Sequence, residues 1–102
     1  MPSSLEETLI EVWRQVLVEN SRSVRLGSAI YPIRRTVKNG LCQVDLQMEG
    51  EDFRGLEQNP NKNSRWAQLA RSGKKVMQFL QNGRYVANVV DGKVTLYDKR
   101  NH

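Results

Sequence analysis

The chain has 102 residues, enough for one domain (1–102) with a single hydrophobic core, and its one cysteine excludes an internal disulfide. No stretch approaches the roughly 18 apolar residues of a membrane-spanning helix, and the first charges are acidic, unlike those of a signal peptide. The formal net charge is +5, and residues 59–84 hold six basic residues and no acidic one. These features predict a basic, soluble protein of the cytoplasm, with no membrane segment.

Residues 1–20 are predicted to form an N-terminal helix. Ser4 and Glu7 have the spacing of a capping box, in which each side chain satisfies a free backbone N–H at the helix start. Apolar residues then recur at helical spacing, so one face of the helix should lie on the core. These residues are Leu5, Leu9, Val12, Trp13, Val16 and Leu17.

Residues 31–48 are predicted to form a β-hairpin with strands 31–38 and 41–48, after a short strand or connector at 23–26. Asn39-Gly40 is the preferred pair for a two-residue type I′ turn, which places Lys38 opposite Leu41. The same register places Arg34 opposite Asp45, where an ion pair could form. One face of the hairpin is apolar and predicted to be core: Tyr31, Ile33, Arg35 and Val37 opposite Met48, Leu46, Val44 and Cys42.

Arg35 is the exception on this apolar face. It could sit at the sheet rim, with its stem over apolar surface and its guanidinium in water. A β-bulge could instead turn it outward. The third interpretation is a half-buried guanidinium that, with Arg65, lines a site for an anion.

After the hairpin, residues 52–56 are predicted to form a strand and residues 64–72 a short helix. Ser64 is a suitable N-cap, and Gly73 can take the left-handed conformation that ends a helix.

Residues 76–98 are predicted to form a three-strand meander of strands 76–81, 84–90 and 93–98, followed by a frayed tail at 99–102. Asn82-Gly83 and Asp91-Gly92 supply the two tight turns. The resulting register places Val76, Leu80, Tyr85, Ala87, Val89, Val94 and Leu96 on one face, and Met77, Phe79, Val86, Val90 and Tyr97 on the other. Both faces are thus more apolar than a water-exposed sheet requires, which predicts covering helices or a homodimer through an aromatic sheet face.

The sequence offers little catalytic chemistry. The single histidine, His102, is at the terminus, and Cys42 belongs to the predicted core face. No metal-binding spacing, glycine-rich phosphate loop or pair of carboxylates is present, so neither a cofactor nor a metal is predicted and the enzyme hypothesis is weak.

The basic region is the remaining functional signal. Basic residues on one face could neutralise phosphates, and Trp66 or Tyr31 could stack on bases. Trp66 also fits the apolar stripe of its own helix. The candidate binding residues are Arg34, Arg35, Lys38, Arg65, Arg71, Lys74 and Lys75.

The C-terminal half contains the runs Glu57-Gln58-Asn59-Pro60 and Ser64-Arg65-Trp66-Ala67. With these runs it resembles short uncharacterised proteins encoded in cyanobacterial genomes. The resemblance implies a cytoplasmic bacterial protein and nothing about its chemistry.

Together these patterns predict an α+β fold, in which an N-terminal helix packs on an antiparallel sheet of five or six strands and a short helix precedes the last three. The leading functional hypothesis is a small non-catalytic interaction or regulatory module that binds a protein partner or a second copy of itself. The alternative is nucleic-acid binding through the basic residues.

Overall fold

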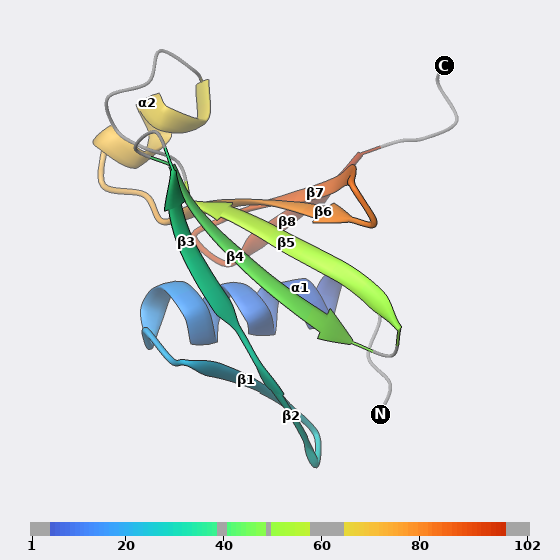
Figure 1. Ribbon diagram of the computed structural model, residues 1–102. Helices are drawn as coiled ribbons and strands as arrows, with labels where there is room; N and C mark the ends of the chain where they lie inside the picture. The colour runs from blue at the N-terminus through green and yellow to red at the C-terminus, as the bar shows by residue number, and fades with distance from the viewer. Residues whose placement is uncertain (1–4, 39–40, 49, 58–64, 98–102) are drawn as a thin grey trace.

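A computed structural model describes residues 5–38, 41–48, 50–57 and 65–97, with the side chains of residue 41 and residues 65–67 outside the description. It confirms the α+β fold: an N-terminal helix lies against one face of an antiparallel sheet, and a short helix lies at one end of that sheet (Figure 1). The elements are α1 (Leu5–Trp13), a π-helical turn η1 (Arg14–Val18), β1 (Ser23–Leu26), β2 (Ala29–Pro32), β3 (Arg34–Lys38), β4 (Leu41–Met48), β5 (Glu51–Glu57), α2 (Arg65–Arg71), β6 (Val76–Gln81), β7 (Arg84–Val90) and β8 (Lys93–Leu96).

The main sheet is a six-stranded meander in the order β3-β4-β5-β6-β7-β8, with every pair antiparallel. Its two C-terminal turns are those the sequence predicts. Asn82-Gly83 has φ values of 51° and 84°, and Asp91-Gly92 has 50° and 84°, as a type I′ turn requires. The predicted turn at residues 39–40 lies outside the described residues, but the predicted register around it, Lys38 opposite Leu41, is confirmed.

The apolar stripe of α1 and η1 forms one side of the core, as predicted: Leu9, Val12, Trp13 and Val16 are buried. The helix contacts β7, β8 and β1, so it covers the inner face of the sheet (Figure 1). Trp13 links α1 to the segment that precedes β6, because its Nε1 donates to the backbone oxygen of Lys75, 3.0 Å away and 62 residues later. The helical segment ends at Val18, and Asn20, two residues later, has a left-handed φ of 55°. The predicted cap at Ser4 lies outside the described residues.

Phe79 occupies the centre of the inner face. It is fully buried and pairs with Gly55 on β5 and Ala87 on β7. Both neighbours are small, which leaves room for the aromatic ring. A Cβ on Gly55 would also lie 2.7 Å from the Sδ of buried Met77, so a larger residue there would force the Met77 side chain to shift.

The predicted single strand 31–38 is wrong. The chain leaves the strand at Ile33, so β2 pairs with β1 in a separate two-stranded sheet and only β3 pairs with β4. Pro32 has no N–H to donate to a longer ladder with β4, whereas β1 offers β2 a local partner across the Gly27-Ser28 turn. Tyr31 and Ile33 still pack on the core, but Val37 is 73% exposed because it lies on the edge strand.

The predicted division of the meander into two faces is also wrong. The β6–β7 register shifts by one residue, so Leu80 pairs with Tyr85 but Phe79 pairs with Ala87. The extra residue, Val86, is buried in the core, as expected for a β-bulge. The bulge brings Ala87 and Val89 to the inner face beside Phe79. It therefore concentrates the apolar residues on one side, which the unshifted register could not do.

The short helix α2 ends as the sequence predicts. Gly73 has φ 94°, its N–H donates to the Ala70 oxygen, and the Lys74 N–H donates to the Leu69 oxygen at 3.1 Å. This pair of hydrogen bonds is the Schellman motif, which satisfies carbonyls left free at a helix end. The predicted cap at Ser64 lies outside the described residues. The helix contacts β6 at the end of the sheet.

Candidate interaction surfaces

The basic candidate residues do not form one surface. Arg34 and Arg35 are adjacent in β3, so their side chains leave opposite faces of the sheet. Lys38 ends β3, and Lys74 and Lys75 precede β6 at the same end of the sheet, near α2 (Figure 1). Arg71 lies in the last turn of α2, and the side chain of Arg65 lies outside the description. Three strand spacings separate β3 from β6, which is about 14 Å.

Arg35 remains on the inner face opposite Val44, without a bulge. Its Nη1 donates to Glu57 Oε2 at 2.9 Å, and its Nη2 donates to the backbone oxygen of Val16 at 2.8 Å. Val16 lies in η1, at the C-terminal end of the helical segment. Carbonyl groups there carry partial negative charge, so a cation beside them is favourable. The guanidinium therefore joins β3, β5 and η1. An anion would have to compete with the carboxylate of Glu57.

Cys42 lies beside the same carboxylate, with its Sγ 3.4 Å from Glu57 Oε2. Partial burial, followed by the negative charge of Glu57, raises the pKa of the thiol above its ordinary value. Because the thiolate is the reactive form, a raised pKa disfavours a nucleophilic role.

The predicted ion pair between Arg34 and Asp45 is replaced by another. The two residues are opposite each other in the register, but Asp45 pairs with Arg54, whose Nε lies 2.8 Å from Oδ1. Partial burial acts to raise the pKa of Asp45. It is outweighed by hydrogen bonds from Arg54 and Gln43 and by the charges of Arg54 and Arg34, so the pKa is lowered. Arg34, Asp45 and Arg54 line an open groove of about 990 Å³, in which both signs of charge are present.

The two aromatic candidates for base stacking are not available as an exposed pair. Tyr31 is partly buried against the core, and the side chain of Trp66 lies outside the description. The sequence interpretation missed a different pair, Tyr85 and Tyr97, whose ring centroids are 6.1 Å apart in an edge-to-face arrangement. The Tyr97 hydroxyl donates to Asn88 Oδ1 at 3.0 Å and accepts from Gln78 Nε2. Tyr85 is 49% exposed, so this pair presents an aromatic edge on the outer face.

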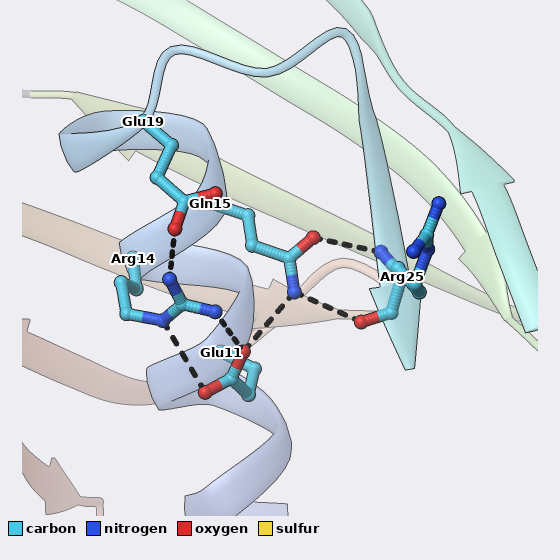
Figure 2. A network of polar contacts seen from close by, with 5 residues as sticks. All are labelled: Glu11, Arg14, Gln15, Glu19 and Arg25. Carbon is cyan, nitrogen blue, oxygen red and sulfur yellow. Dashed lines mark hydrogen bonds and ion pairs between the residues drawn. The ribbon is translucent and has the colours of Figure 1, made fainter. Parts of the chain in front are cut away.

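Gln15 is the buried polar residue of η1 and holds β1 against the helix (Figure 2). Its Oε1 accepts from the Arg25 N–H, and its Nε2 donates to the Arg25 backbone oxygen, both at 2.8 Å. Nε2 also donates to Glu11. The amide thus pairs with β1 much as a neighbouring strand would. Periodicity could not reveal this contact, because Gln15 is a polar residue beside a helical apolar stripe.

Glu11 continues this network through Arg14, which also pairs with Glu19 (Figure 2). Hydrogen bonds from Arg14 and then Gln15 lower the pKa of Glu11, and those to Glu11 raise the pKa of Arg14. Both carboxylates, Glu11 and Glu19, are paired with Arg14, and Arg25 takes part through its backbone, so the network is a structural connection between helix and strand.

The edge of β8 is the most distinctive uncovered surface. The Tyr97 N–H donates to the Val86 oxygen on β7 at 2.9 Å. Because successive residues of an antiparallel strand direct their N–H and C=O groups to opposite sides, Val94 and Leu96 direct theirs away from β7. Within the described part of the chain, neither residue has a backbone hydrogen bond to a further element. Leu96 is 43% exposed, and Leu5, at the start of the neighbouring α1, is 37% exposed.

Residues 5–38, 41–48, 50–57 and 65–97 contain no group of three or more side chains that could hold a metal ion. None of the helices described there has the length and apolar character that crossing a bilayer requires. His102 lies outside those ranges, and the cytoplasmic, bacterial origin stays a prediction. No family model matches the chain, and no curated protein or solved structure matches it.

Proposed function

We propose that the protein is a non-catalytic interaction module that forms a homodimer by joining the β8 edges of two copies. The observation that carries this proposal is the free backbone of Val94 and Leu96, bordered by exposed apolar side chains. An uncovered edge strand is a template for strand pairing unless charges, proline or a covering element block it. Between Val94 and Leu96 the edge carries only Thr95, and no charge.

The proposed pairing has one register that satisfies both backbone and side chains. A twofold axis perpendicular to the sheet keeps the inner faces of both copies on the same side. Residues directly opposite each other must then belong to the same face. Val94 of one copy faces Leu96 of the other as a hydrogen-bonded pair, and Thr95 faces Thr95. On the outer face Lys93 faces Tyr97, where an ammonium group can lie against the aromatic ring.

The area of this contact limits its strength. A strand of four residues, with flanking contacts from the tyrosines, falls at the small end of protein interfaces, below about 1,200 Å². We therefore expect a reversible dimer with a dissociation constant in the micromolar range.

Sedimentation velocity over a micromolar to millimolar concentration series tests the proposal. The wild-type protein is expected to shift from monomer to dimer. Leu96→Asp should stay monomeric, because it places a charge in the apolar pair with Val94. Ile30→Asp is the matched control, since Ile30 is an exposed apolar residue of β2, outside the main sheet. A wild-type monomer at millimolar concentration, or equal weakening by both substitutions, would contradict the β8 dimer.

Nucleic-acid binding is the second candidate. It is supported by the position of Lys38, Lys74 and Lys75 at one end of the sheet, with Arg71 on the adjacent helix. Affinity for mixed-sequence DNA or RNA should then fall steeply as salt rises, because phosphate contacts release counterions. The combined substitution Lys74→Ala/Lys75→Ala should reduce the salt slope by about two. Arg84→Ala, at the opposite end of β7, is the control. Absence of binding at low salt would eliminate this candidate.

A further inference from the structure

The β3 edge opens a second surface, and we infer that it docks an acidic, extended segment of a partner protein by strand addition. β3 is the other terminal strand of the sheet, and all five of its residues are exposed. In strand addition, main-chain hydrogen bonds supply affinity and alternate side chains supply specificity. This inference goes beyond the proposed dimer and uses the opposite edge of the sheet.

The outward backbone groups of β3 follow from its register with β4. Lys38 and Leu41 flank a two-residue connection, and such a flanking pair is hydrogen-bonded in a hairpin. The alternation then directs the N–H and C=O of Arg35 and Val37 away from β4. Neither residue has a backbone hydrogen bond to a further element in the described chain. Two consecutive sites for an added strand are therefore open.

The side chains of β3 determine which strand can use these sites. Three of the five residues are basic, and none is acidic. Arg35 is already paired with Glu57, whereas Arg34 and Lys38 form no ion pair with any residue of the described ranges. Both of these cations belong to the outer face, on either side of Thr36.

A second copy of β3 is a poor occupant for this edge. Antiparallel pairing centred on Thr36 would place Arg34 of each copy opposite Lys38 of the other, and directly opposed like charges are destabilising. The same charges would attract an incoming strand with acidic residues four positions apart. The basic residues thus exclude self-pairing and select a partner of opposite charge.

The geometry specifies the probe. Its central five residues are Glu-Val-Thr-Val-Glu, one for each residue of β3. The glutamates face Arg34 and Lys38, the threonine faces Thr36, and the valines cover Val37 and the apolar stem of Arg35. The probe is designed for antiparallel addition, the pairing found between all neighbouring strands of the main sheet, so its valine amides point toward β3 and its threonine amide points away. End-blocked fluorescent peptides would be titrated with the wild-type protein at low ionic strength, where exposed charges are least screened.

The glutamate peptide is expected to bind at least about tenfold more tightly than its Lys-Val-Thr-Val-Lys counterpart, because the latter opposes like charges. N-methylation of both valines should weaken binding by at least about tenfold, since it removes the N–H groups that pair with the edge. N-methylation of the threonine is the control, because that amide points away from β3. Equal binding of both methylated peptides would overturn strand addition.

Substitutions in the protein give an independent readout. Val37→Pro removes an outward N–H but keeps the charges of β3 and its hydrogen bonds with β4. It should therefore weaken binding of the glutamate peptide and leave the circular dichroism spectrum of the protein unchanged. Arg34→Glu/Lys38→Glu should reverse the preference toward the lysine peptide. Leu96→Asp should bind the glutamate peptide like the wild type, which separates this inference from the β8 dimer.

A single-stranded oligonucleotide of equal charge tests the competing ligand class. If it binds more tightly than the glutamate peptide, and Val37→Pro does not change its affinity, the β3 edge would be assigned to nucleic acid instead.

Discussion

Phe79→Ala is expected to lower the free energy of unfolding by about 3–5 kcal/mol, the range for deleting a buried aromatic ring. Phe79 is fully buried between Gly55 and Ala87. Neither neighbour has a side chain that can move into the space left by the ring, so the cavity should persist. The cost should therefore approach the upper part of the range.

Urea or guanidinium unfolding, followed by circular dichroism, measures this loss. Val37→Ala is the matched control on the same face of the sheet, because Val37 is 73% exposed and its truncation should change stability by less than about 0.5 kcal/mol. Since single domains are stable by only about 5–15 kcal/mol, Phe79→Ala could leave the chain largely unfolded at 37 °C. A loss no greater than that of Val37→Ala would show that Phe79 is not at the centre of the core.

Gln15→Ala is expected to lower the free energy of unfolding by about 2–4 kcal/mol, because two backbone groups of Arg25 lose their partner at about 1–2 kcal/mol each. The substitution keeps helix propensity, so the effect should arise from the contact with β1 and not from the helix itself. β1 has β2 as its only strand partner in the described sheets. Loss of the Gln15 amide should therefore release the two-stranded sheet before the main one.

Hydrogen exchange distinguishes this local effect from general destabilisation. In Gln15→Ala the Arg25 amide should exchange through local opening of β1. Its rate should therefore rise more than the rates of the β6 and β7 amides, which exchange only through global unfolding. Arg25→Ala is the control, because it removes a side chain that lies on the surface and leaves both backbone groups bonded to Gln15. Unchanged exchange at Arg25 in the Gln15 variant would contradict the proposed contact.

Much of the local structure could be predicted from residue patterns alone. The apolar stripe predicted the N-terminal helix, the dipeptides Asn82-Gly83 and Asp91-Gly92 predicted the tight turns, and Gly73 predicted the end of α2. Each of these signals depends on neighbours within one or two turns of the chain. The register around residues 39–40 followed from the same local rule.

The candidate surfaces were less accessible to sequence interpretation. The basic residues were grouped by their closeness in the chain, but adjacent Arg34 and Arg35 leave opposite faces of β3. The free edge of β8 depends on the order of the strands, which the sequence did not specify. The Tyr85–Tyr97 pair arose from the bulge, since the unshifted register had placed these two residues on different faces.

The sequence by itself determined which segments are helices and strands and where the C-terminal turns lie, because backbone preference and apolar alternation are properties of neighbouring residues. Only the tertiary structure decided how those segments meet. The break at Ile33 depends on competition between β1 and β4 for the same strand, and the bulge at Val86 on the space around Phe79. Arg35 found its acceptors on η1 and β5, far away in the chain. Burial and partner choice are set by such distant groups, and for that reason the two open edges became visible only in the folded chain.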